Sequence, residues 1–267
     1  MRGFSEKWTD LPDYILGITK EIWEGRGIDT LNHYYEENIP MRLPEGVSIG
    51  NKKTINGTLA TLAEFPDRQL IGEDVIWSGN DKDGFLSSHR LLTTGSHTGG
   101  GYFGPPTGKK FVIRAIADCA AINNQINDEW LIRDTAGLVK QLGLEPIQFA
   151  KDLIEREGGP EKCVKPFSKK TDVPGPYKGK GNKNEWGERL SVILTNLMSK
   201  DIATIQREYD RAVQTEHPGS ITAHSWSETE YLWMSLISSF PNATFNVEHQ
   251  IGREDPLHPP RAAVRWS

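Results

Sequence analysis

An aspartate at the end of a strand-like segment is the leading candidate for chemistry in this sequence. Side chains alternate along a strand, so Asp128, Trp130, Ile132 and Asp134 share one face. Desolvation beside an indole in an apolar cavity would raise the pKa of a carboxyl, which could then exchange a proton near neutral pH. Asp134 also precedes a helix-like stretch, so its alternative role is that of a helix N-cap.

A histidine on another strand-like segment is the natural partner of such an acid. His97 shares a face with His89, Phe85 and Thr93. An imidazole there could polarise a carbonyl or shuttle a proton, and the alternative is a histidine satisfied inside the sheet. The catalytic alternatives require that Asp134 and His97 point into one shared cavity, whereas the structural alternatives do not.

Five further side chains could line a pocket. Trp77, Trp130 and Tyr102 could hold a flat ring or a cationic ammonium group, or they could simply pack in the core. Asp118 and Arg90 lie in otherwise apolar strands, where they could form an ion pair or Arg90 could hold an anion. The alternative is that both face the outer side of the sheet. With His89, these residues form the predicted substrate-binding set.

Metal and cofactor motifs are missing from the sequence. The histidines show no HExxH or comparable ligand spacing, and the two cysteines, Cys119 and Cys163, form no CxxC pair. The run Gly99–Gly104 formally fits GxGxxG, but prolines and a strand follow it instead of the helix that a dinucleotide site needs. We therefore predict no metal and no cofactor.

The elements that must position these residues can be read from the spacing of apolar residues, which is helix-like at first and strand-like afterwards. Apolar residues recur at helical spacing in the segments 11–23 and 52–64. Between them, Asp29 is an early-turn or cap acid for a second short helix through Tyr34 and Tyr35. Four long strand-like segments follow, at 69–77, 85–97, 109–122 and 126–133. Three helices followed by antiparallel strands predict an α+β domain, and a bent sheet folded over helices leaves a pocket on its concave face.

The pattern restarts after a segment rich in proline, glycine and lysine. Tyr34, Phe65 and Arg90 recur as Tyr209, Phe240 and Arg265, all at an offset of 175 residues. A period of this length indicates a duplicated domain. We therefore predict a complete domain over residues 1–160, a basic linker over 161–183 and a partial second copy over 184–267 that lacks the last strands. The linker is either a solvated connector or a patch for an anionic partner.

Composition narrows the function classes. The net charge of -5 argues against nucleic acid as a partner, and no apolar stretch is long enough to span a membrane. The N-terminus lacks the features of a signal peptide, and two cysteines are too few for a disulfide scaffold. A cytoplasmic location is the expectation.

Several short motifs occur in the order and spacing of a known family. They are Phe65-Pro66-Asp67, Gly95-Ser96-His97-Thr98-Gly99, Pro106-Thr107-Gly108, Asn127-Asp128-Glu129-Trp130-Leu131-Ile132-Arg133-Asp134 and Gln141-Leu142-Gly143-Leu144. Together they resemble the SnoaL-like polyketide cyclase and ester cyclase group of the NTF2-like superfamily. The resemblance covers residues 11–144 well and residues 184–267 more weakly.

The resemblance implies a cone of three helices on a curved antiparallel sheet, here duplicated. In the cyclases an aspartate ends the last strand as general acid or base, and Asp134 matches it. The resemblance implies no metal, no cofactor, and pairing as a homodimer or an internal pseudo-dimer. The cyclases carry a histidine where Asp118 stands here, and an Asp-Gly turn where Asn123-Asn124-Gln125 stands. Both departures weaken a polyketide-cyclising role.

Two functions remain open from the sequence. One is an enzyme that moves a proton next to the carbonyl of a small, largely apolar or aromatic compound, in cyclisation, isomerisation or dehydration. Asp134 would move the proton and His97 would assist at an oxygen. The other is a non-catalytic module for ligand binding or dimerisation, because the fold hosts both kinds of protein.

Overall fold

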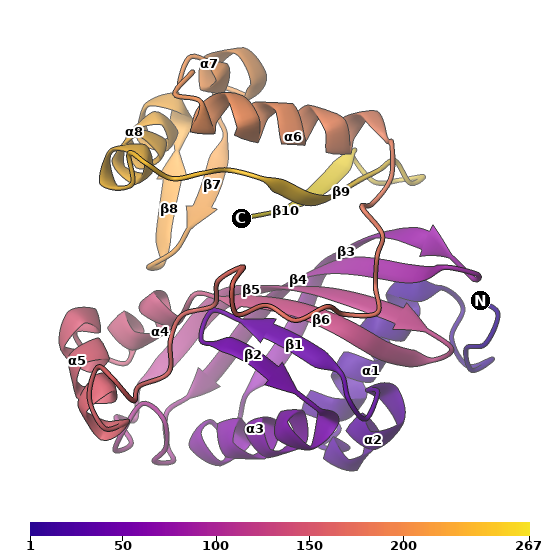
Figure 1. The fold of residues 1–267 in the computed structure, drawn as a ribbon, viewed down its shortest axis with the longest axis vertical. Coiled ribbons are helices and arrows are strands. Elements are labelled where there is room, and N and C mark those ends of the chain that lie inside the picture. Colours follow the sequence, from indigo (N-terminus) through magenta and orange to yellow (C-terminus); the bar gives the residue numbers. More distant parts are fainter. The chain divides into compact units, whose positions relative to one another are not determined.

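The computed structural model describes all 267 residues, which divide into two compact units, Met1–Lys178 and Gly179–Ser267. In chain order, the helices and strands of the first unit are α1 (Leu11–Trp23), the 3-10 turn η1 (Ile28–Thr30), α2 (Leu31–Tyr34), β1 (Pro40–Leu43), β2 (Gly46–Ile49), α3 (Asn51–Glu64), β3 (Gln69–Asn80), β4 (Gly84–Ser96), β5 (Lys110–Ile122), β6 (Gln125–Arg133), α4 (Thr135–Gln141) and α5 (Pro146–Arg156). The predicted α+β class, with helices packed on a curved sheet, is confirmed (Figure 1).

Helix α1 begins at a capping aspartate and presents one apolar face to the sheet. The side chain of Asp10 accepts a hydrogen bond from the backbone N–H of Asp13 at 2.8 Å. The buried residues of the helix recur at spacings of three and four: Leu11, Tyr14, Ile15, Ile18 and Ile22. They join strand residues such as Val75, Phe85 and Ile126 in the main core of the unit.

The sheet has six strands in the order β2-β1-β6-β5-β4-β3. The four long strands pair antiparallel, as the sequence predicts. The short hairpin β1–β2 extends this sheet, because β1 pairs with β6 in parallel. The sequence indicated short extended pieces here but gave no sign of the parallel pairing, which depends on contacts distant along the chain.

The hairpin between β5 and β6 decides which side chains face the helices. Asn123 and Asn124 form a two-residue turn with positive φ at both positions, which asparagine tolerates. The register then shifts between Ala120 and Ala121, so that Ile126 and Glu129 both point toward the helices although they are three residues apart. The helix-facing side of β6 after this bulge therefore carries the odd-numbered residues, Glu129, Leu131 and Arg133.

Part of the predicted linker is held against the first unit. Arg42 on β1 donates from Nε to a carboxylate oxygen of Asp172 at 2.6 Å and from Nη2 to the carbonyl of Val173 at 2.7 Å. The backbone N–H of Tyr177 donates to the carboxylate of Asp128 at 3.2 Å. Arg42 is also ion-paired with Asp128, and both side chains are buried. The segment is therefore anchored at residues 172–177, in contrast to the solvated connector that its composition suggested.

The second unit contains α6 (Glu185–Met198), α7 (Thr204–Glu208), β7 (Gln214–His217), β8 (Ile221–His224), α8 (Ser225–Ser239), β9 (Val247–Arg253) and β10 (Arg261–Trp266). These elements follow the order of α1, α2, β1, β2, α3, β3 and β4 at an offset close to 175 residues. The hairpins β7–β8 and β9–β10 form separate two-stranded sheets, because nothing in this unit corresponds to the β6 and β5 strands that join the two hairpins of the first unit. The order agrees with a partial duplication, which stays a prediction.

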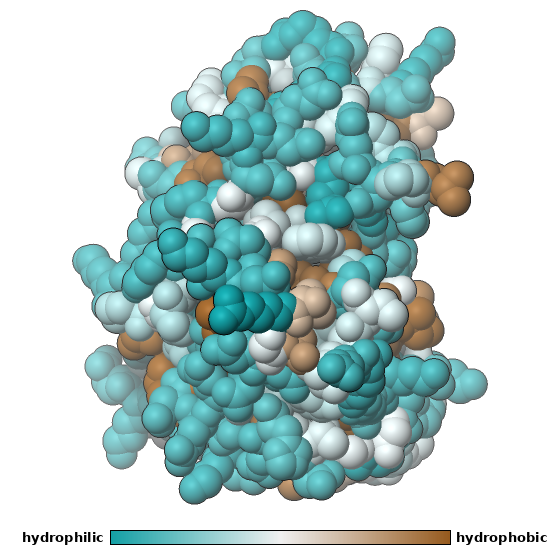
Figure 2. Space-filling model, turned by 90° about the vertical axis from the view of Figure 1, so that its right-hand side faces the viewer, coloured by the Kyte–Doolittle hydropathy of each residue, from teal (hydrophilic) through white to brown (hydrophobic).

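The face drawn in Figure 2 is mainly hydrophilic, with small hydrophobic patches separated from one another. None of the helices combines the length and the apolar character that a membrane span requires.

Candidate functional site

A cavity of about 430 Å³ lies between the helices and the concave face of the first unit's sheet. Helices α1 and α3 line one side, and alternate residues of β4, β5 and β6 line the other. Most of the lining is aliphatic or aromatic, including Ile18, Phe65, Leu91, Ile113 and Leu131. A mostly apolar cavity with a few polar groups is the usual form of a small-molecule site.

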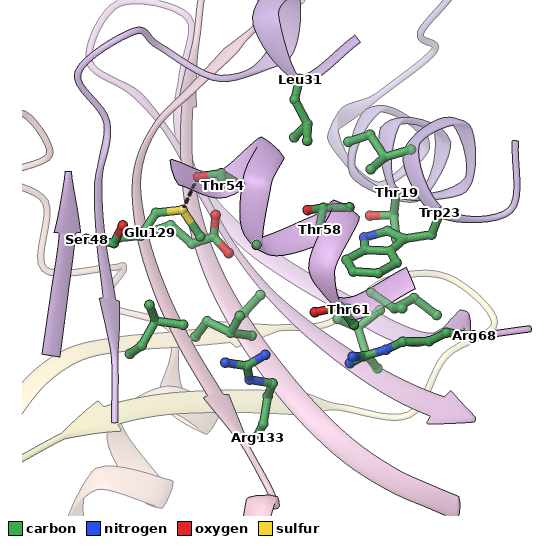
Figure 3. A pocket seen from close by; sticks show the side chains of 18 of the residues that line it. Thr19, Trp23, Leu31, Ser48, Thr54, Thr58, Thr61, Arg68, Glu129 and Arg133 are labelled. Atoms are coloured by element: carbon green, nitrogen blue, oxygen red, sulfur yellow. Dashed lines mark hydrogen bonds between the residues drawn. The ribbon is translucent and has the colours of Figure 1, made fainter. Parts of the chain in front are cut away.

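Glu129 on β6 places a carboxyl in this cavity, beneath α3 (Figure 3). The side chain is almost completely buried, and Oε2 has no hydrogen-bond partner. Burial raises the pKa of Glu129 to about 7, although a hydrogen bond from Tyr35 and the positive charge of Arg133 act in the opposite direction. A carboxyl of this kind can both accept and donate a proton near neutral pH.

Two neutral groups accompany Glu129 in the cavity. Burial and the neighbouring Glu129 carboxylate raise the pKa of Tyr35 well above 10, so its hydroxyl stays a hydrogen-bond donor. Burial lowers the pKa of His89 to about 4, so its imidazole is uncharged at neutral pH. The Nε2 atom of His89 is buried and has no hydrogen-bond partner in the protein.

Helix α3 contributes a row of hydroxyl groups. Thr54, Thr58 and Thr61 line the cavity, and their spacing of four and three residues places them on one face of the helix. Figure 3 shows them along the side of α3 that faces Glu129, Arg68 and Arg133. The hydroxyl of Thr54 donates to the sulfur of Met41 at 2.8 Å.

The structure brings only two of the residues predicted from the sequence into the cavity. His89 and Tyr102 line it. Asp134 does not, and its carboxylate accepts from the backbone N–H of Gly137 at 2.9 Å as the N-cap of α4. His97 is fully buried and also lies outside the lining. The predicted acid and histidine therefore do not share the cavity, and their catalytic roles stay predictions.

His97 holds the glycine-rich loop at one end of the cavity. Its Nδ1 accepts from the backbone N–H of Thr107 at 3.3 Å, and its Nε2 lies 3.3 Å from Glu64. The Glu64 carboxylate accepts from the backbone N–H groups of Tyr102 and Phe103 at 3.1 and 2.8 Å. Gly99 packs so closely that a Cβ there would lie 1.9 Å from the carbonyl oxygen of Ala63. The motif around His97 thus fixes the loop to the end of α3.

The remaining predicted residues lie elsewhere. Trp77 packs edge-to-face on Phe85 in the core, with ring centroids 5.6 Å apart. Trp130 lies on the opposite face of β6, where the guanidinium of Arg42 is 4.4 Å from its ring. Arg90 is exposed and pairs with Glu73 at 3.3 Å. Asp118 is buried opposite Trp130 in the β5–β6 register and does not line the cavity.

The sequence reasoning missed most of the lining, including the polar residues Tyr35, Arg68, Glu129 and Arg133. Alternation along β6 separated the residues correctly into two sets, but both sets contain polar and apolar members. The set with Asp128 and Trp130 was placed in the pocket, whereas the structure places Glu129 and Arg133 there. Arg68 follows a turn after α3, where no periodic pattern of apolar residues indicates which way a side chain points.

Metal-binding geometry is not found in the chain, since no cluster of three or more histidine, cysteine, aspartate or glutamate side chains could hold an ion. The polar groups that the cavity does contain can act on a ligand by hydrogen bonding, charge and proton transfer.

Comparisons with known proteins point to one family. Residues 14–142 match the family model of the SnoaL-like polyketide cyclases. Among curated proteins, none matches this chain at a significant level.

Solved structures resemble the first half of the chain. IdmH from Streptomyces antibioticus is 22% identical and is covered over 98% of its length by 50% of this chain, with a TM-score of 0.43. TsrD from Streptomyces laurentii is 18% identical, with 50% of this chain and 95% of that chain covered and a TM-score of 0.43. A SnoaL-like polyketide cyclase from Agrobacterium tumefaciens is 17% identical, with 49% and 97% covered and a TM-score of 0.42.

The matched residues contain most of α1, helices α2 and α3, the six-stranded sheet and all the polar groups of the cavity. Residues 14–142 of this chain therefore form a SnoaL-like domain.

Proposed function

We propose that the first unit catalyses a cofactor-independent proton transfer on a small carbonyl compound, with Glu129 as the general acid and base. The observation that carries the proposal is the buried Glu129 carboxyl, whose pKa lies near 7 and which has an oxygen free of partners in an apolar cavity. The reaction belongs to the class of aldol-type cyclisation, isomerisation or dehydration. All three begin by removing a proton from the carbon next to a carbonyl.

The side chains of the cavity supply the required steps. The ionised Glu129 carboxylate takes the proton from that carbon, and the bonding electrons move onto the carbonyl oxygen as an enolate. Neutral His89 and the α3 hydroxyls are the groups placed to donate hydrogen bonds to that oxygen. Glu129 then returns its proton to carbon or to the leaving oxygen.

Exchange of ligand protons with D2O tests this proposal without knowledge of the natural substrate. We expect the wild type to accelerate exchange of the α-protons of aromatic ketones such as acetophenone, followed by NMR. Glu129→Gln should reduce that acceleration by about 10²–10⁴-fold, because the general base is lost. Binding of the same ketone, measured by thermal shift, should persist.

The matched variant is Asp134→Asn, which tests the residue that the family resemblance favours. Asparagine keeps the N-cap of α4, so we expect an unchanged exchange rate. If Asp134→Asn loses exchange and Glu129→Gln keeps it, the proton belongs to Asp134. If the wild type accelerates exchange of no ketone that it binds, the site is a binding module.

We propose in addition that the outer face of the sheet pairs with another sheet, in a homodimer or an internal pseudo-dimer. Ile71, Val112, Ile116 and Ile132 project from this face and are about half exposed or more. Light scattering of the full chain separates the two arrangements. A mass twice the 30.0 kDa of the chain that falls to 30.0 kDa in Ile132→Lys supports the homodimer, and a wild type of 30.0 kDa contradicts it.

A further inference from the structure

Two arginines enter the cavity with no carboxylate close enough to neutralise them fully. Arg68 is only 6% exposed, and its side chain makes one hydrogen bond, from Nε to the hydroxyl of Thr93 at 3.1 Å. Its guanidinium carbon lies 5.2 Å from the ring centroid of Trp23. The two Nη groups therefore have no acceptor in the protein.

Arg133 is the second cation. Its Nε is buried without a hydrogen-bond partner, and its nearest carboxylate is that of Glu45, 3.9 Å from Nη2. At that separation the pair is a weak, partly exposed contact. Figure 3 shows the guanidinium groups of Arg68 and Arg133 entering the same space below α3, with Thr61 between them. Arg68 comes from the segment between α3 and β3, and Arg133 comes from the end of β6.

The two charges repel each other. Burial lowers the pKa of Arg68 to about 9, and repulsion from Arg133 is the second, smaller cause. Arg68 therefore still carries its charge at neutral pH. Glu129 does not fully neutralise the pair, because burial raises its pKa to about 7 and so favours its uncharged form. Buried charges are normally paired, because removing a charge from water without a counter-ion is unfavourable.

We propose that Arg68 and Arg133 form an anion subsite that binds a carboxylate of the ligand. The inference deepens the proposed function, on which it rests for the identity of the cavity as the ligand site. Two guanidinium groups that face one space offer several N–H donors to a carboxylate, whose two oxygens fit their planar geometry. The bound carboxylate would replace the missing counter-ion.

The subsite also sets the length of the ligand. Glu129 and Arg133 are four residues apart on one face of β6, so their Cα atoms are separated by about 13 Å. A carboxylate at the arginines thus leaves room for a carbonyl near Glu129, within an otherwise apolar cavity. The ligand class is therefore a keto acid with an aromatic or aliphatic body, rather than a neutral ester.

The test compares an acid with neutral analogues of the same shape. The probes are 4-oxo-4-phenylbutanoate, its methyl ester and its amide, with affinities measured by isothermal titration calorimetry at pH 7. We expect the wild type to bind the acid about 10- to 100-fold more tightly than either analogue. Equal affinity for all three probes would overturn the proposal.

Variants of the two arginines assign the preference to the subsite. Arg68→Gln and Arg133→Gln should each remove most of the preference for the acid while leaving the affinity for the ester within about threefold. Arg114→Gln is the matched control, because Arg114 lies on the outer face of β5 and pairs with Glu73 at 2.9 Å. Should the buried Arg68 variant fail to fold, the more exposed Arg133 variant and the wild-type comparison still decide the outcome. A preference retained in both folded variants contradicts the assignment.

Glu129→Gln separates this inference from the proposed function. We expect that variant to keep the preference for the acid, since the subsite lies outside its carboxyl group. A chain that prefers the acid but never exchanges its α-protons has an anion subsite without the proposed proton transfer. A chain that exchanges ketone protons through Glu129 and binds acid and ester alike has the proposed function without the subsite.

Discussion

Glu129→Gln should make the protein more stable above pH 8, by up to about 3 kcal/mol in the free energy of unfolding. The magnitude follows from the difference between a pKa of about 7 in the folded protein and the usual value of 4.5. An ionised carboxylate buried in an apolar cavity opposes folding, and a neutral amide of the same shape removes that charge. A functional carboxyl commonly carries such a cost.

The sign follows from the direction of the shift. The folded protein holds a proton on Glu129 that the unfolded chain releases above about pH 4.5. The proton therefore favours folding at low pH, and its contribution is lost as the pH rises toward and through 7. Relative to Glu129→Gln, the wild type should lose stability between about pH 5 and pH 8.

Urea unfolding followed by circular dichroism from pH 5 to pH 8.5 measures this difference. Comparison of wild type and variant at each pH cancels other buried groups, such as His89 and His249, whose lowered pKa values act in the opposite direction. Glu155→Gln provides the control, because Glu155 is exposed on α5 and should give a difference that does not change with pH. A flat difference for Glu129→Gln would mean that its carboxyl is ionised throughout this range.

Arg42→Met is expected to reduce the free energy of unfolding of the first unit by about 3–5 kcal/mol. The side chains of Arg42 and Asp128 are 4% and 0% exposed, so the ion pair between them is shielded from water. Removing the arginine leaves the Asp128 carboxylate buried with less compensation, and it also removes both hydrogen bonds to Asp172 and Val173. The segment 172–177 should then detach from β1.

Urea unfolding and limited trypsin digestion measure the two consequences. Cleavage after Lys178 should become faster in Arg42→Met than in wild type, because the segment before it loses its anchor. Arg189→Met is the matched control: Arg189 is 55% exposed and pairs with Glu208 at 2.9 Å, so its loss should cost about 0–1 kcal/mol. Equal effects of the two substitutions would show that burial of the Arg42 pair contributes nothing.

A large part of the fold could be predicted from local patterns. The apolar stripe of α1, the hairpin turn at Asn123-Asn124 and the four long strands all agree with the structure to within a few residues. These features depend on neighbours in the chain, through helical spacing, strand alternation and turn preference. The capping alternative for Asp134 was likewise visible, because a cap involves residues only three positions apart.

The cavity was decided by tertiary structure. Alternation indicated that Glu129 and Trp130 lie on opposite faces of β6, but the sheet's curvature and the bulge at Ala120 and Ala121 determined which face the helices cover. The parallel pairing of β1 with β6 and the approach of Arg68 to Arg133 join residues more than 60 positions apart. The sequence alone thus determined the kind of domain, whereas the burial that gives Glu129 its pKa exists only once these distant segments have packed together.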